Sequence, residues 1–107
     1  MDSEKMISQW LGSNLDETVN SLARLVSIPS ISTDGAHGAQ LDQSAAIVAQ
    51  LAAETGFPEV EILRPDSGYP AVMASWTVDP KASTLLMLSH HDVQPVNYRS
   101  EWKTDPW

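Results

Sequence analysis

The N-terminal part of the chain carries apolar residues at intervals of three and four positions, a spacing that places them on one face of a helix. The stripe consists of Ile7, Leu11, Leu15, Val19, Leu22 and Val26. The sequence Ser13-Asn14-Leu15-Asp16 resembles a variant of the capping box, so the helix is predicted to restart there after Gly12. Pro29 is predicted to end it, because the residue before a proline avoids helical backbone angles.

A second helix is predicted from about Gln40 to Thr55, after a loop over residues 30–38 that is rich in Ser, Thr, Asp and Gly. Gly56 stands where a left-handed cap is expected. The inner stripe of this helix is predicted to contain Leu41, Ala45, Val48 and Ala52, widened by Ile47 and Leu51. Core packing explains both helical stripes.

Three extended segments follow, at residues 60–63, 71–77 and 85–88. The last is uniformly apolar, which favours a strand buried on both faces between helical layers. Two helices followed by three strands indicate an α/β fold. We expect a partial three-layer sandwich in which the two N-terminal helices pack on a mostly parallel or mixed sheet.

Composition narrows the classes of function. The 107 residues make one domain at most, and a net charge of −8 argues against nucleic-acid binding. There is no cysteine, so disulfides and thiol catalysis are excluded. The N-terminus lacks the features of a signal peptide and no apolar run suits a membrane span, so we expect a cytoplasmic protein without a membrane partner.

The candidate chemistry lies at His90 and Asp92, directly after the third extended segment. Side chains alternate along a strand, so these two are predicted to point the same way, and ligands collect at the carboxyl ends of strands. A neutral imidazole is a good zinc ligand, and a carboxylate usually fixes its orientation. By spacing alone, a His-x-Asp is more often a surface or capping pair. His91 should point the opposite way as a pocket-wall residue, and His37 is interpreted as a loop residue.

The motif Leu-Ser-His-His-Asp-Val-Gln-Pro-Val, followed by Glu-Trp-Lys-Thr-Asp-Pro at residues 101–106, resembles the first active-site motif of the co-catalytic zinc metallopeptidases. This family includes carnosinase, cytosolic nonspecific dipeptidase, acetylornithine deacetylase and succinyl-diaminopimelate desuccinylase. Residues 25–32 and 56–60 resemble its first loop and its helix-to-strand turn. Gln94-Pro95 is closer to the dipeptidase branch than to the deacylases.

The resemblance implies that His90 is a metal ligand, to one zinc of a two-metal site, and that Asp92 is the catalytic-site residue that orients its imidazole. It also implies a hydrolase that cleaves peptide bonds with metal-activated water. Two positions depart from the family pattern: Ser89 replaces the usual Gly, and Trp107 stands where Phe is usual. Both changes are conservative in size or aromatic character.

The remaining ligands and the Glu-Glu pair that supplies the family's general base have no counterpart in this sequence. We therefore expect residues 1–107 to be the N-terminal part of a catalytic domain, binding zinc weakly or not at all and inactive alone. The substrate is expected to be a dipeptide. An N-acyl amino acid deacylase of the same family and a non-enzymatic small α/β interaction module remain alternatives, and a homodimer of the full-length protein remains open.

Overall fold

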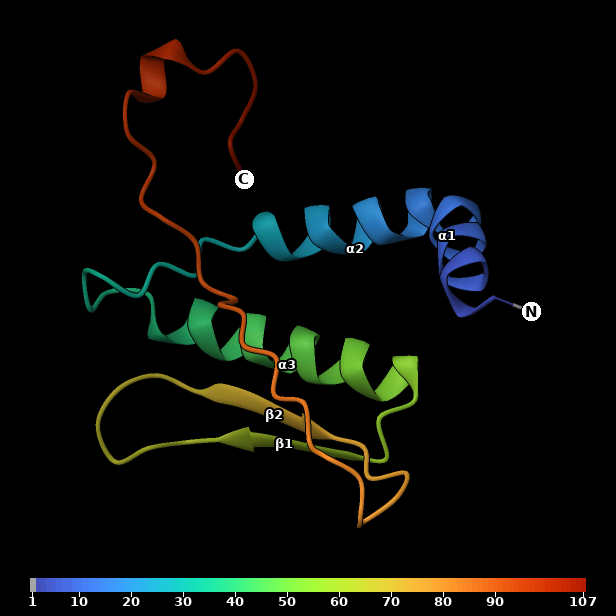
Figure 1. Cartoon of the computed structure of the whole chain (residues 1–107). Coiled ribbons are helices and arrows are strands. Elements are labelled where there is room, and N and C mark those ends of the chain that lie inside the picture. Colours follow the sequence, from blue (N-terminus) through green and yellow to red (C-terminus); the bar gives the residue numbers. More distant parts are fainter. Residues whose placement is uncertain (1) are drawn as a thin grey trace.

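A computed structural model describes residues 2–107 (Figure 1). Three helices precede a single β-hairpin, and a long irregular segment follows it. The elements are α1 (Ser3–Ser13), α2 (Leu15–Val26), α3 (Gly38–Thr55), β1 (Glu59–Leu63), β2 (Ala71–Ser75) and the short 3-10 helix η1 (Arg99–Glu101). No helix among residues 2–107 has both the length and the apolar character needed to cross a membrane.

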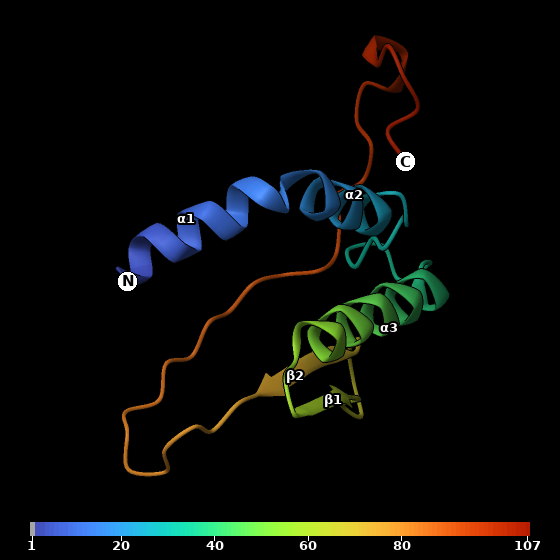
Figure 2. The same ribbon diagram turned by 90° about the vertical axis from the view of Figure 1, so that its right-hand side faces the viewer.

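The predicted restart of the first helix is confirmed, since Asn14 separates α1 from α2. The predicted capping box is not formed. The side-chain amide of Asn14 donates to the Trp10 carbonyl at 2.8 Å, and no side-chain bond caps α2. The side chain of Asn14 therefore closes the end of α1, while its carbonyl oxygen accepts from the Thr18 amide at 3.0 Å at the start of α2. The two helices follow one another with a bend between them (Figure 2).

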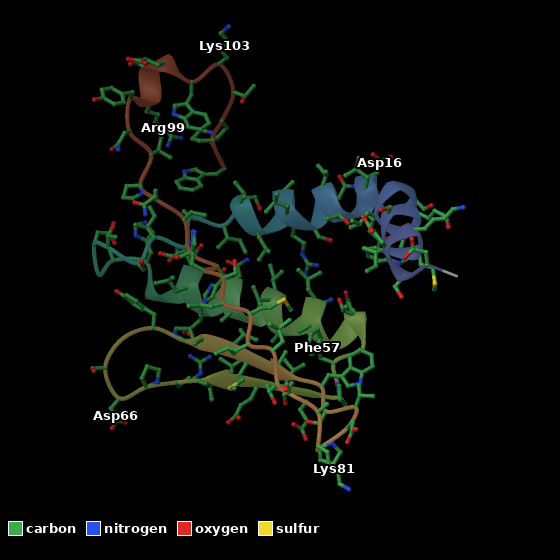
Figure 3. The ribbon with its side chains drawn as sticks, viewed as in Figure 1. Asp16, Phe57, Asp66, Lys81, Arg99 and Lys103 are labelled. Carbon is green, nitrogen blue, oxygen red and sulfur yellow. The ribbon has the colours of Figure 1, made fainter. Side chains whose placement is uncertain are left out.

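Helix α3 packs on both strands of the hairpin, and α2 lies on the other side of α3 (Figure 1). Gly56 has a φ of 108°, the left-handed cap that the sequence predicted. Beside it, Phe57 meets Trp76 edge-on with ring centroids 6.1 Å apart, where the chain leaves α3 for β1 (Figure 3). The Arg24 guanidinium donates to the Gln50 side chain at 3.2 Å and so links α2 to α3.

The hairpin strands are antiparallel, with Val60 opposite Ala74 and Ile62 opposite Val72. These four residues are partly buried, while their neighbours along the strands are mostly exposed, which is the alternation expected of a half-buried sheet. The α/β arrangement of helices packed on a sheet is confirmed. The prediction of a mostly parallel or mixed sheet was too loose. Within residues 2–107 the two paired strands are antiparallel, and the only parallel pairing is an isolated bridge between Ile31 and Val93.

The prediction of a buried strand at residues 85–88 is wrong: the structure of residues 2–107 has no strand there. Leu88 is 96% exposed, and Leu85, Leu86 and Met87 are exposed to a similar degree. A strand needs a neighbouring strand to bond its backbone, and the sheet within residues 2–107 consists of β1 and β2 alone. Figure 2 shows this segment running well away from the hairpin before it returns toward α3. Apolar composition alone does not make a strand without a partner strand beside it.

The buried core is small and lies where the loop after α2 meets the first turns of α3. Its members are Ile28, Ile31, Leu41 and Ala45, together with the buried hydroxyl residues Ser30 and Ser44. The radius of gyration is 16.8 Å, whereas a compact chain of this length has about 13 Å. The apolar stripe along α1 and α2, which the sequence assigned to core packing, is instead exposed: its members range from 42% exposed at Val26 to 60% at Ile7. The buried part of the molecule is thus confined to the region that also contains the candidate site.

Candidate functional site

Residues 91–93 are held against the loop after α2. The Val93 amide donates to the Ser30 carbonyl at 3.1 Å, and Ile31 and Val93 form a parallel bridge. Ile31 is 6% exposed and anchors this loop in the core. The candidate residues are therefore placed by a contact between segments about sixty positions apart, rather than by the end of a buried strand as the sequence predicted.

The structure brings His90 and Asp92 together. His90 Nδ1 lies 3.0 Å from Asp92 Oδ1 and 3.1 Å from the Asp92 carbonyl oxygen. An ionised carboxylate and a carbonyl only accept hydrogen bonds, so Nδ1 must carry the proton. In the neutral ring this leaves Nε2 with a free lone pair, on a side chain that is 82% exposed. A metal ligand in this tautomer would use the Nε2 lone pair.

Asp92 is fixed from its other side by a hydroxyl. Ser32 Oγ donates to Asp92 Oδ2 at 2.5 Å, and the Asp92 side chain is 25% exposed. The pKa of the Asp92 carboxyl lies below its usual value. The hydrogen bond from Ser32 is the largest cause and lowers it, burial is the next and raises it, and the hydrogen bond from His90 lowers it further. Asp92 is therefore ionised at neutral pH and can accept from both partners.

His91 points the opposite way, as strand-like alternation predicted. Its Nδ1 lies 2.9 Å from Ser44 Oγ on α3, and its Nε2 lies 3.1 Å from the Pro70 carbonyl oxygen, just before β2. A carbonyl accepts only, so Nε2 carries a proton. Ser44 Oγ also lies 3.0 Å from the His91 carbonyl oxygen. The ring thus joins the site segment to α3 and to the hairpin.

A pocket of about 220 Å³ opens beside these side chains. It is lined by the residues of the His90–Asp92 segment and by the loops facing it: Ser32, Leu41, Tyr69, Pro70, His90, His91 and Asp92. A second hollow of about 240 Å³ shares Tyr69 and Pro70 and extends to Arg64 and Asp42, whose side chains form an ion pair at 2.6 Å. His91 is a pocket-wall residue, as predicted.

Other residues that the sequence singled out lie elsewhere. His37 pairs with Asp34 at 2.9 Å in the loop before α3, in agreement with its interpretation as a loop residue. The segment 97–107, which contains the Trp-x-x-Asp-Pro motif, lies apart from the site in both views (Figures 1 and 2). Within residues 2–107 no group of three or more His, Cys, Asp or Glu side chains is arranged to hold a metal ion.

Sequence reasoning missed the hydroxyl residues that position the site. Ser32 contacts Asp92, Ser44 contacts His91, and Ser30 is fully buried with its carbonyl bonded to Val93. Ser44 lies four positions after Gln40 and next to Ala45, on the helix face predicted to be buried. A polar residue on such a face needs a partner, and this signal could have identified it.

Two curated proteins that match this chain are both named as Cys-Gly metallodipeptidases. The Cys-Gly metallodipeptidase dug1 of Schizosaccharomyces pombe is 32% identical over 103 residues, which cover 86% of this chain and 21% of the relative. The Cys-Gly metallodipeptidase DUG1 of Saccharomyces cerevisiae is 25% identical over 97 residues, which cover 80% of this chain and 20% of the relative. No family model and no solved structure matches the chain.

The chain spans about a fifth of the length of these curated relatives. The predicted resemblance to metallopeptidases of the dipeptidase branch is confirmed, because both relatives are named as metallodipeptidases. Their names place these two relatives among the metallopeptidases, which are hydrolases.

Proposed function

We propose that this chain, a relative of Cys-Gly metallodipeptidases, supplies one metal ligand of a metal-dependent dipeptidase. The observation that carries the proposal is the His90–Asp92 pair: Nδ1 is held by the carboxylate at 3.0 Å, and Nε2 is free on an exposed ring. This is the arrangement in which a carboxylate fixes the tautomer and orientation of a metal-ligating histidine. The donor chemistry of the pair fits a divalent metal such as zinc.

In this proposal His90 would hold the metal through Nε2, and Asp92 would keep the ring oriented. A metal bound there supplies Lewis acidity toward the carbonyl group of a peptide bond. One imidazole does not make a tight site, because three or four protein ligands are typical for zinc. We therefore propose that residues 1–107 alone do not hydrolyse dipeptides, and that activity requires ligands and a general base from further sequence.

The substrate class proposed is a dipeptide. The relatives are named for Cys-Gly hydrolysis, which favours dipeptides over the N-acyl amino acids of the deacylase alternative and favours an enzyme over a non-enzymatic interaction module. The identity of the metal as zinc, a count of two ions, a homodimer of the full-length protein and a cytoplasmic location stay predictions from the sequence.

The test uses the full reading frame, purified with its metal and assayed on Cys-Gly and other dipeptides with and without a chelator. Hydrolysis is expected to stop with chelator and to return when zinc is added. His90→Ala should lower activity by more than about 100-fold, and Asp92→Asn by about 10–100-fold, as partners of ligating histidines do. Metal content measured by atomic emission should fall in His90→Ala.

A matched control is His37→Ala, which removes a histidine from an exposed loop outside the site and should leave activity and metal content unchanged. Chelator-insensitive hydrolysis, or full activity in His90→Ala, would contradict the proposal.

A further inference from the structure

We infer that Ser32 is a positioning residue of the site, whose hydroxyl fixes the Asp92 carboxylate so that this carboxylate holds His90 in the tautomer that leaves Nε2 free. The contact is Ser32 Oγ to Asp92 Oδ2 at 2.5 Å, and His90 Nδ1 occupies the other oxygen at 3.0 Å. The inference rests on the proposed function only in calling the site a metal site. The hydrogen-bonded chain of Ser32, Asp92 and His90 stands on geometry alone.

The backbone places Ser32 for this role. The loop carrying it runs beside the site segment through the bond from the Val93 amide to the Ser30 carbonyl and through the parallel bridge of Ile31 to Val93. Ile28 and Ile31 are 5% and 6% exposed, so the loop is packed into the core on both sides of Pro29. Ser32 is thus delivered to Asp92 by an anchored loop rather than by a freely moving one.

The chemistry of the carboxylate explains why a second partner matters. A carboxylate turns readily about its bond to the β-carbon, and one hydrogen bond from an exposed imidazole is a weak constraint on that rotation. The Ser32 hydroxyl assigns one oxygen and leaves the other for His90. Without it, the Asp92 carbonyl oxygen, 3.1 Å from Nδ1, is the one fixed acceptor that still favours the Nδ1–H tautomer. The His90 ring then protonates more readily at Nε2, and that tautomer has no lone pair on Nε2 for a metal.

Two other hydroxyls separate this role from general support of the segment. Ser44 Oγ lies 2.9 Å from His91 Nδ1 and 3.0 Å from the His91 carbonyl oxygen, and Ser30 Oγ lies 3.5 Å from that same carbonyl. Neither makes a hydrogen bond to Asp92. Loss of Ser44 loosens the segment without freeing the carboxylate, so Ser44→Ala is the matched control.

The first experiment measures the ¹⁵N chemical shifts of the His90 ring in the 107-residue chain, at a pH of about 8.5 where an imidazole is neutral. Wild type is expected to show mainly the Nδ1–H tautomer. Ser32→Ala should shift the population toward Nε2–H, Ser32→Thr should restore it by keeping a hydroxyl, and Ser44→Ala should leave it as in wild type. Unchanged His90 shifts in Ser32→Ala, or an equal change in Ser44→Ala, would overturn the inference.

The second experiment measures zinc affinity of the full reading frame by competition with a chromophoric chelator. Ser32→Ala is expected to weaken zinc binding about 3–10-fold, less than the 10–100-fold expected for the direct partner Asp92, with recovery in Ser32→Thr. The two proposals fail separately. Zinc binding and activity retained in His90→Ala would reject the metal role while the tautomer result stood. An inactive His90→Ala together with unaltered affinity and tautomer in Ser32→Ala would reject only the role of Ser32.

Discussion

Two segments close together in sequence differ in how well they are packed against the rest of the molecule. Residues 85–88 are four consecutive apolar residues, and all four are about 80% exposed or more. Residues 91–93 contain a histidine and an aspartate, yet they are partly buried and bonded to the loop after α2 and to α3. The more polar segment is the better packed one.

The difference shows that hydrogen-bond and packing partners, rather than apolar composition, decide which part of this chain is buried. Residues 91–93 find Ser30, Ser32 and Ser44 within the described chain, and these groups satisfy their backbone and side chains. Residues 85–88 find no strand beside them among residues 2–107, so their apolar surface stays in water. The hydrogen bonds that hold His90, His91 and Asp92 are therefore formed even though the segment leading to them is not packed.

The largest expected effect is on the free energy of unfolding, when a core side chain beneath the site is truncated. Leu41→Ala should destabilise the chain by about 2–4 kcal/mol, because Leu41 is 1% exposed and its removal leaves a cavity. Leu88→Ala should change stability by less than about 0.5 kcal/mol, because Leu88 is 96% exposed. Urea unfolding followed by circular dichroism measures both. Similar losses for the two variants would remove the contrast between the regions.

The next effect concerns the histidine that joins the site segment to the rest of the fold. His91→Ala should cost about 1–3 kcal/mol, because it leaves the Pro70 carbonyl without its partner and removes the ring that contacts Ser44. His37→Ala, a loop histidine, is the control and should cost much less. Unfolding in urea gives both values, and equal stabilities would show that the ring of His91 does not link α3 to the hairpin.

Much of the fold followed from sequence pattern. The break near Asn14, the helix ending at Gly56 and the first two strands were predicted because periodicity and caps are local signals. The third strand was not predictable in this way, because a strand depends on neighbours that a local pattern does not specify. The pairing of His90 with Asp92 followed from alternation, whereas Ser32 lies sixty positions from Asp92 and no spacing rule connects them.

A smaller effect is expected on association. Exposed apolar surface on residues 85–88 should make the 107-residue chain self-associate as its concentration rises. The double variant Leu86→Ser and Leu88→Ser should sediment closer to a monomer in analytical ultracentrifugation, with its unfolding midpoint unchanged. A matched double substitution on another exposed surface, Glu17→Ser and Glu61→Ser, should not reduce association. Equal association of wild type and the double variant Leu86→Ser and Leu88→Ser would show that residues 85–88 do not drive self-association.

The smallest effect concerns how the stability of the fold falls at acid pH. The Ala36 amide and the His37 ring bond Asp34 at 2.9 Å each and lower the pKa of its carboxyl below 3.8. A lowered pKa in the folded state contributes stability above pH 3.8 that is lost as pH falls through the lowered value. Carbon-13 titration of the Asp34 carboxyl should therefore show a midpoint below 3.8, and His37→Ala should move it upward. A midpoint at 3.8 or above in wild type would contradict the pair.

The most direct test of the central claim is amide hydrogen exchange in the 107-residue chain, compared at Val93 and Leu88. The Val93 amide donates to the Ser30 carbonyl at 3.1 Å, whereas Leu88 lies in the exposed segment. The account predicts that Val93 exchanges at least about tenfold more slowly than Leu88, relative to their unstructured rates. Equal and unprotected exchange at both amides would show that the chain does not hold its own candidate site in place.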